Sequence, residues 1–490
     1  METQDDIKNN PGEIDYNRKW YVMAAVAMGI FLATIDSSII NVALPTLVRQ
    51  YKTDFATVQW VILAYLLTLA TLLLSVGRLA DMRGKKPIYG TGFFVFTAGS
   101  ILCGFAPTIY WLIFFRIVQA VGATMILALG MAIVTEAFPA SERGKALGFT
   151  GSMVSIGIVI GPTIGGIIID ALSWNWIFFV NIPVGIIGIW MVVKFVPNLK
   201  PIGKQRFDVP GAVFLFISLL SLLIGLTLGQ QQSFIEFRVL ILFFISIIFF
   251  GIFIWQEFHT DQPMIDLDLF KNKIFSISLA TGFLTFFTIA GTIILMPFYL
   301  ENNLGYGTRQ VGLMLAVVPI AMGVVSPISG SLSDRFGSRV IAVLGLIILL
   351  VGYYAISQLK LTTTMLEYIL RFLPIGLGMG VFQSPNNSTI MGHAPRNQLG
   401  VVSGMLAINR TIGQTIGIAI LGALWASRII FYSNSSINAS GTNAVSIYQV
   451  LALHDTFIIV FFIILVALVL SIWGLLIERN LQTYKKNIPL

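Results

Sequence analysis

The chain has 490 residues, of which 56% are hydrophobic and only 11% are charged. Soluble domains contain about 25% charged residues, so this composition excludes an ordinary soluble domain and indicates a protein that crosses the membrane many times. The formal net charge is +8. Because basic residues in membrane proteins usually mark cytoplasmic loops, we expect no nucleic-acid partner. The single cysteine, Cys103, excludes a disulfide framework.

Fourteen apolar runs follow residues 1–19, which we expect to be a cytoplasmic tail rather than a signal peptide. Each run is long enough to span the membrane as a helix, and charged residues or Gly and Pro turns bound it. The runs lie at about 20–44, 57–77, 88–106, 109–136, 144–170, 176–196, 209–229, 238–258, 274–299, 310–332, 340–358, 367–391, 401–426 and 454–477. An even number of spans places both termini on the same side.

Basic residues in the short loops predict which side this is. With the termini inside, twenty-one Lys and Arg residues fall in cytoplasmic loops and tails, and six fall outside. This distribution predicts an N-in, C-in topology. The three remaining arginines, Arg116, Arg371 and Arg410, lie inside spans.

An internal repeat relates the two halves of the chain. The segment from Gly77 to Gly84 recurs from Gly330 to Gly337, and Arg116 recurs at Arg371, with offsets of 253 and 255 residues. Such repeats in transporters indicate two bundles that move about a central site. We expect an all-α polytopic membrane protein with two pseudo-symmetric six-helix bundles and two inserted helices. The predicted parts are the tail at 1–19, the first bundle at 20–196, the insert at 197–273, the second bundle at 274–477 and a cytoplasmic tail at 478–490.

The lone carboxylate of Asp36 lies inside the first span. A charge at this depth costs roughly 2.5–3.5 kcal/mol on insertion scales, so it should face protein or water and usually has a function. Arg116 lies at a similar depth in the fourth span, so we expect the two to pair. Protonation of Asp36 would then release Arg116 toward Gln119, one turn away. A permanent structural ion pair is the alternative.

The repeated cytoplasmic loops are candidates for a gate. An aspartate there can accept hydrogen bonds from an opposing helix N-terminus or pair with an arginine of the other bundle, and the glycines permit close helix contact and a tight turn. The alternative for the basic residues is that they only fix topology. The predicted gating residues are Gly77, Asp81, Arg83 and Gly84 in the first loop and Gly330, Asp334, Arg335 and Gly337 in the second.

The fifth span carries small residues on one face around a proline. Small residues let helices touch, and a proline bends the helix, although ordinary tight packing would also explain them. The residues are Gly157, Gly161, Pro162, Gly165 and Gly166.

The first helix also offers a polar stripe. At 100° per residue, Thr34, Ser38, Asn41 and Pro45 share one face, and Asp36 points to the other. We expect the Asn41 face to line a substrate cavity and the Asp36 face to pack on a neighbouring helix. Three phenylalanines of the ninth span are better explained as ordinary packing than as a cavity wall. The predicted cavity residues are Asn41, Tyr65, Gln119, Gln383, Asn387, Arg410 and Gln414.

The sequence offers little for catalysis. The three histidines are far apart and the chain has no phosphate-binding G-x-x-x-x-G-K-[ST] motif, so we expect no metal, no cofactor and no direct use of ATP. A membrane-embedded transferase would need paired acidic residues at a membrane face or a large external domain. We therefore expect no enzyme activity and leave a membrane enzyme and a non-transporting receptor as remote alternatives.

Several of these segments resemble the major facilitator superfamily, and the resemblance runs from about Trp20 to Glu478. The loop from Gly77 to Lys86 resembles its signature cytoplasmic loop, and the segment from Arg116 to Gly122 resembles its fourth-helix arginine motif. The small-residue run of the fifth span is similar to the motif associated with antiporters.

Fourteen spans, together with Asp36 to Pro45 and Trp174 to Gly185, narrow the resemblance to the 14-helix drug:proton antiporter family. Asn175 and Met82 depart from that family, which often has basic residues there. The resemblance implies a multi-pass cell-membrane antiporter that exchanges protons for small amphipathic organic substrates by alternating access, with membrane lipid as its surroundings. A proton-linked lipid exporter and a solute symporter of the same superfamily are the alternatives.

Overall fold

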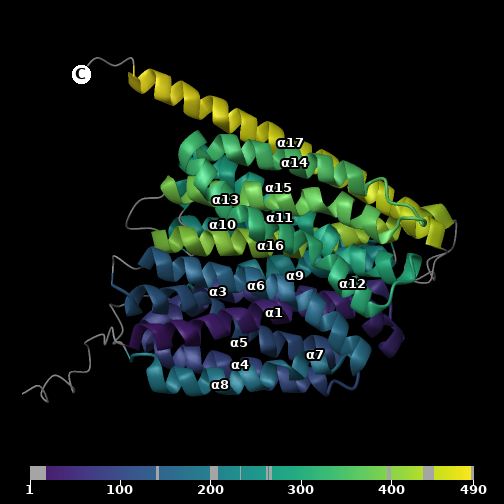
Figure 1. Ribbon diagram of the computed structural model, residues 1–490, viewed down its shortest axis with the longest axis horizontal. Coiled ribbons are helices and arrows are strands. Elements are labelled where there is room, and N and C mark those ends of the chain that lie inside the picture. The colour runs from purple at the N-terminus through teal and green to yellow at the C-terminus, as the bar shows by residue number, and fades with distance from the viewer. Residues whose placement is uncertain are drawn as a thin grey trace, which may run out of the picture.

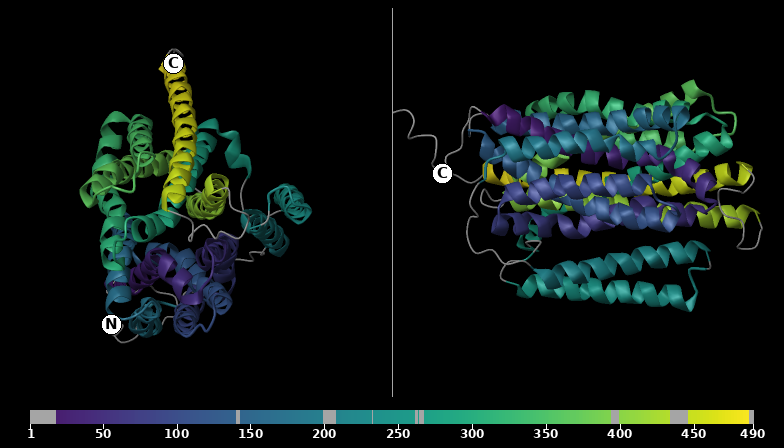
Figure 2. Two further views of the ribbon diagram at one scale, coloured as in Figure 1. Left: turned by 90° about the vertical axis from the view of Figure 1, so that its right-hand side faces the viewer. Right: turned by 90° about the horizontal axis from the view of Figure 1, so that it is seen from below.

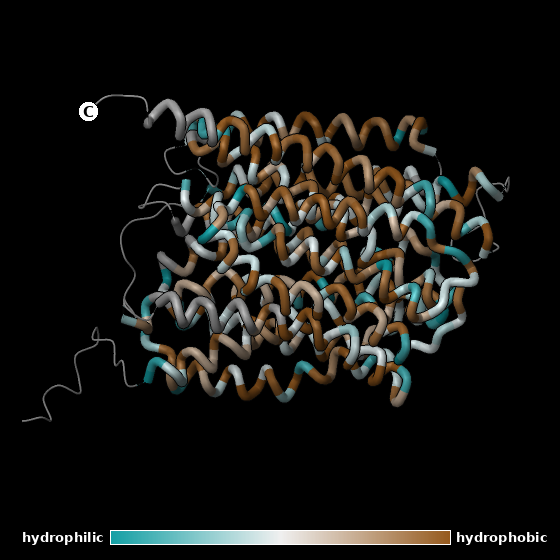
Figure 3. The backbone as a smooth tube through the Cα atoms, turned by 45° about the horizontal axis from the view of Figure 1, so that its top comes forward, coloured by the Kyte–Doolittle hydropathy of each residue, from teal (hydrophilic) through white to brown (hydrophobic). Residues whose placement is uncertain are grey.

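The computed structural model describes residues 18–139, 143–198, 208–231, 233–260, 263, 267–393, 399–433 and 446–486. These residues form helices and the turns between them, without strands. Most of the long helices run side by side along one axis, and α1 begins at the same end at which α17 ends (Figure 1). Hydrophobic residues predominate along the middle of the helices, and hydrophilic residues gather toward the two ends (Figure 3). This distribution is typical of a protein that spans a membrane.

The first six membrane crossings come from eight helices. Two of the crossings are each built from a short helix and a longer one that follows it. The helices are α1 (Lys19–Tyr51), α2 (Phe55–Val58), α3 (Trp60–Arg83), α4 (Lys85–Gly104), α5 (Ile109–Ala137), α6 (Arg143–Ala171), α7 (Trp176–Phe179) and α8 (Asn181–Phe195). Asp54 begins α2 by accepting a hydrogen bond from the Thr57 amide at 2.7 Å, as an N-cap residue does.

Two inserted helices, α9 (Val209–Gln231) and α10 (Phe237–His259), lie together at the side of the molecule (Figure 2). The indole nitrogen Nε1 of Trp60 in α3 donates a hydrogen bond to Oγ1 of Thr227 in α9 at 3.1 Å. The helix α9 also contacts α16, so the insert packs where the two halves of the chain meet.

The last six crossings begin with η3 (Leu267–Lys271) and α11 (Lys273–Phe298), which continues into the π-helix η4 (Tyr299–Asn303). π-Helices are rare in proteins, and those that occur are often found at functional sites. The remaining helices are α12 (Thr308–Leu315), α13 (Val317–Phe336), α14 (Ser338–Ile356), α15 (Met365–Gly392), α16 (Leu399–Ser433) and α17 (Ser446–Lys486).

The predicted fourteen-helix fold is confirmed. Among the described residues, 13 helices are long and apolar enough to cross a membrane. The fourteenth crossing is α6, whose 29 residues include the shorter apolar segment from Ile156 to Ala171. The repeat is also visible in the backbone, because Gly84 and Gly337 end α3 and α13 with φ of 96° and 91°. Both values lie in a region that favours glycine.

Candidate functional site

A buried ion pair joins α1 and α5. Oδ2 of Asp36 lies 2.6 Å from Nη1 of Arg116, and the two side chains are 0% and 1% exposed. The structure thus brings together the two charges that the sequence places at the same depth. Because a buried charge without its partner costs about 3–5 kcal/mol, each residue requires the other in its charged form.

Two carboxamides complete the surroundings of Asp36. Oδ1 of Asp36 accepts hydrogen bonds from Nε2 of Gln119 at 2.7 Å and from Nδ2 of Asn181 in α8 at 2.9 Å. Arg116 Nη1 also donates to Oε1 of Gln119 at 2.6 Å. Gln119 therefore contacts both members of the ion pair, and it keeps a bond to Arg116 if the carboxylate becomes neutral.

Other polar groups hold this network in place. Ser100 in α4 accepts a hydrogen bond from Nε2 of Gln119 at 2.8 Å, and the carbonyl of Val61 accepts one from Nε of Arg116 at 3.1 Å. The sequence reasoning did not single out Ser100 or Asn181 as site residues. Asn181 could have been predicted as a site residue, because it is a lone carboxamide in the apolar sixth span.

The guanidinium of Arg116 also packs on Tyr65, with 4.2 Å between its carbon Cζ and the ring centroid. Nη2 of Arg116 and the hydroxyl of Tyr65 are buried without a hydrogen-bond partner among the described residues. Tyr65 and Gln119, which we predicted as cavity residues, thus lie in the charge network. The network keeps two donors that can bind an incoming polar group.

The small residues of α6 pack against α1. A β-carbon at Gly157 would lie 2.9 Å from Cβ of Thr34, and one at Gly161 would overlap Ser38. The hydroxyl of Ser38 donates a hydrogen bond to the carbonyl of Gly157 at 3.0 Å. The expectation that the whole Thr34, Ser38 and Asn41 stripe faces a cavity is therefore wrong, because close helix contact buries its inner part.

The same face of α6 continues onto α12 of the other half. A β-carbon at Gly166 would lie 2.6 Å from the carbonyl oxygen of Thr308, and one at Gly312 would overlap the carbonyl of Pro162. Gly165 instead faces Ile39 of α1. The predicted motif therefore joins a helix of its own half to a helix of the other half.

The outer ends of the two halves are in contact. Arg49 at the end of α1 pairs with Glu301 in η4, and the rings of Phe55 and Phe298 lie 5.1 Å apart. At the inner end, Lys85 pairs with Glu136 within the first half. Arg339 pairs with Glu478 within the second half at 2.7 Å. The structure thus represents a state in which the outer end is closed.

The predicted gating loops are described in part. The side chains of Asp81 and Asp334 lie outside the described residues, whereas those of Arg83 and Arg335 are exposed. A β-carbon at Gly77 would meet nothing within 4 Å, so the expectation that this glycine permits close helix contact is wrong. A β-carbon at the equivalent Gly330 would lie 3.3 Å from Oγ of Ser384.

Among its described residues, the second half has no copy of the buried ion pair. Arg371, the repeat partner of Arg116, donates hydrogen bonds to the carbonyls of Ala355 at 2.8 Å and Gln358 at 2.9 Å. These carbonyls lie at the C-terminal end of α14, where a cation is favourable. Arg371 is therefore explained by helix capping.

The remaining predicted cavity residues are half-buried: Asn41, Gln383, Asn387, Arg410 and Gln414. Oδ1 of Asn41 is buried without a hydrogen-bond partner among the described residues. Within the described part of the chain, no hydrogen bond or ion pair joins these five side chains to one another. Asn386, beside Asn387, donates to the carbonyl of Ser278 at 3.0 Å.

Comparisons with known proteins identify the family of the chain. A family model described as the Major Facilitator Superfamily matches residues 26–418. The riboflavin transporter RibZ of Clostridioides difficile is 35% identical over 84% of this chain and 90% of the relative. The multidrug resistance protein Stp of Mycobacterium tuberculosis is 32% identical over 83% of this chain and 75% of the relative.

A solved structure shares the fold. A bacterial homologue of the human lysosomal transporter Spinster, in an inward-facing and unoccupied conformation, superposes with a TM-score of 0.66. The match covers 94% of this chain and 98% of that chain at 18% identity, so it bears on the fold alone.

Proposed function

The chain belongs to the major facilitator superfamily of membrane transporters, and we propose that it is a proton-coupled antiporter that exports amphipathic organic compounds by alternating access. The observation that carries this proposal is the buried pair of Asp36 and Arg116 with its shared partner Gln119. Relatives named multidrug resistance proteins support the class of substrate.

Asp36 is the proton carrier in this proposal. A proton from outside converts its carboxylate into a carboxylic acid and removes the negative charge from the ion pair, while Arg116 stays charged. Arg116 then keeps its bond to Gln119 and its packing on Tyr65. The proton leaves Asp36 on the cytoplasmic side, and the substrate crosses in the opposite direction.

Alternating access requires that the outer contacts open. The ion pair of Arg49 and Glu301 and the contact of Gly166 with Thr308 hold the two halves together in the outer-closed state. Both must separate before a substrate can leave to the outside. Asp36 lies on the same helix as Arg49, and α6 packs along this helix, so a movement of α1 on protonation would displace both contacts.

A second candidate is transport of riboflavin, which the 35% identity to the riboflavin transporter RibZ favours. Riboflavin is an amphipathic heterocycle, so the two candidates differ in substrate range and direction rather than in chemistry. An exporter with a broad range moves dyes and drugs outward. A riboflavin importer takes up one vitamin.

Everted membrane vesicles with an imposed pH gradient, acidic inside, test the proposal. We expect the wild type to accumulate several dyes and drugs in the vesicles, and we expect Asp36→Asn to lose the gradient-driven part. Asp54→Asn is the matched control, because asparagine also caps a helix. Full gradient-driven transport by Asp36→Asn would make the coupling assignment wrong. Movement of riboflavin alone, out of the vesicles, would support the second candidate.

A further inference from the structure

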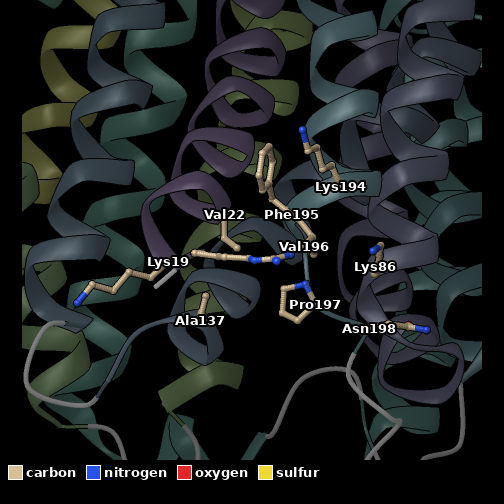
Figure 4. Close-up of a pocket in the computed structure, with 10 residues that line it drawn as sticks. Lys19, Val22, Lys86, Ala137, Lys194, Phe195, Val196, Pro197 and Asn198 are labelled. Carbon is tan, nitrogen blue, oxygen red and sulfur yellow. The ribbon is translucent and has the colours of Figure 1, made fainter. Parts of the chain in front are cut away.

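A basic pocket lies at the inner end of the first half, where α1 and α4 begin and α5 and α8 end (Figure 4). Its volume is about 240 Å³. Four lining residues are basic, Arg18, Lys19, Lys86 and Lys194, and none of the described residues that line it is acidic. Such pockets between membrane helices on the cytoplasmic side fit lipid headgroups that carry negative charge.

An acidic residue near this pocket, Glu136, is already paired. Glu136 near the end of α5 forms its ion pair with Lys85, the neighbour of Lys86. Nζ of Lys194 lies over the rings of Trp190 at 4.8 Å and Phe195 at 5.3 Å. No acidic residue in the described part of the chain forms an ion pair with Lys86 or Lys194, so we expect their charges to be available to an anion from the membrane surface.

The lysines do not converge on one point. Lys19, Lys86 and Lys194 lie on different sides of Val196 and Pro197 in this view (Figure 4). A single small phosphate would contact only one or two of them. An extended headgroup, with its phosphate and glycerol groups at the membrane surface, can contact several.

The pocket is continuous with a lipid-facing surface. Lys194 and Phe195 end α8, whose side chains Ile186, Trp190 and Val193 are exposed along the membrane-spanning segment. Tyr21 of α1 stacks on Phe195, with 4.6 Å between the ring centroids. Aromatic residues at this level are typical of the membrane interface. Acyl chains can therefore lie along α8 while the headgroup occupies the pocket.

We propose that this pocket binds the headgroup of an anionic phospholipid of the inner leaflet. Lys86 and Lys194 hold the phosphate, and the exposed face of α8 contacts the acyl chains. A bound lipid joins the beginnings of α1 and α4 to the end of α8. Because a basic residue near an anionic surface contributes roughly a fivefold effect, loss of two should weaken binding about 25-fold.

Native mass spectrometry of the purified full chain, titrated with phosphatidylglycerol, tests this. We expect Lys86→Gln/Lys194→Gln to bind phosphatidylglycerol at least tenfold more weakly than the wild type. Lys86→Arg/Lys194→Arg should bind like the wild type, which shows that charge rather than packing is responsible. Arg238→Gln/Lys360→Gln is the matched control, because it removes two basic residues outside the pocket and at the outer end.

Three results would overturn the proposal. The first is equal retention of phosphatidylglycerol by the wild type and the Gln variant, or equal retention of phosphatidylcholine and phosphatidylglycerol by the wild type. The second is displacement of the lipid by millimolar inorganic phosphate, which would make the site one for soluble phosphate. The third is phosphatidylglycerol binding that is detected only after residues 1–15 are deleted. This result would show that acidic side chains of the tail occupy the pocket in the full chain, namely those of Asp5, Asp6, Glu13 and Asp15.

Discussion

Arg49 and Glu301 join the outer ends of the two halves, with 2.7 Å between Nη2 of the arginine and Oε2 of the glutamate. Their burial is unequal, because the arginine side chain is 55% exposed and the glutamate side chain is 4% exposed. The glutamate lies in the π-helix η4, which continues α11 beyond Pro297. The carboxylate is thus held by the second half, and the arginine of the first half reaches it across the closed outer end.

Arg49→Ala should shift the protein toward the outward-open state. Ion pairs with an exposed partner contribute about 0.2–1 kcal/mol, so we expect the closed-to-open ratio to fall by a factor of about 1.4 to 5. Double electron–electron resonance between spin labels at Lys52 and Arg309, which lie on opposite halves, would show a larger population of long distances. Arg238→Ala is the control, and an unchanged distance distribution in Arg49→Ala would show that the pair does not hold the gate.

The depth of the buried ion pair could be predicted from the sequence, whereas its surroundings could not. The 1.5 Å rise per residue fixes how deep Asp36 and Arg116 lie once the spans are known. The sequence does not fix how α4 and α8 are rotated about their axes, because packing decides it. The contact of Ser100 with this network was therefore visible only in the structure, and the lone carboxamide of Asn181 could be noticed in the sequence without its partner being known.

Two other outcomes show the limits of pattern reasoning. The polar stripe of α1 was correctly expected to avoid lipid, but a stripe does not say which neighbour it faces, and the glycines of α6 cover its Thr34 and Ser38 part. The repeat correctly paired Arg371 with Arg116 in sequence. However, α11 contains no acidic residue, so the second half has no ion pair at that place.

Asn181→Leu should weaken both stability and transport. The change removes a donor from Oδ1 of the buried Asp36, and a hydrogen bond to a charged group contributes about 1.5–3 kcal/mol. We expect a lower thermal unfolding temperature and at least a tenfold loss of gradient-driven efflux. Asn409→Leu is the matched control, because Asn409 donates to the carbonyl of Leu279, away from the charges. If both variants lost stability equally and kept wild-type efflux, Asn181 would have only a structural role.

Gly166→Ala should disfavour the outer-closed state. Its β-carbon would lie 2.6 Å from the carbonyl oxygen of Thr308, a backbone atom of the other half that cannot move aside easily. Overpacking of this kind costs about 1–3 kcal/mol, and the cost disappears when the halves separate. The Lys52 to Arg309 distances should therefore lengthen, while Gly251→Ala, where a β-carbon meets nothing within 4 Å, should leave them unchanged. Unchanged distances in both variants would contradict the assigned contact.

Gly84→Ala and Gly337→Ala should destabilise the protein by similar amounts. The two residues hold equivalent places in the repeat and have φ of 96° and 91°, a region in which a side chain costs about 1–3 kcal/mol. Gly77→Ala is the control, because Gly77 lies within α3 with nothing within 4 Å of the added carbon, and alanine there should stabilise by about 0.5–1 kcal/mol. Thermal unfolding of the purified variants measures all three. If Gly84→Ala lowered the stability and Gly337→Ala did not, the two turns would contribute differently to the stability of the folded protein, although they are alike in sequence and backbone.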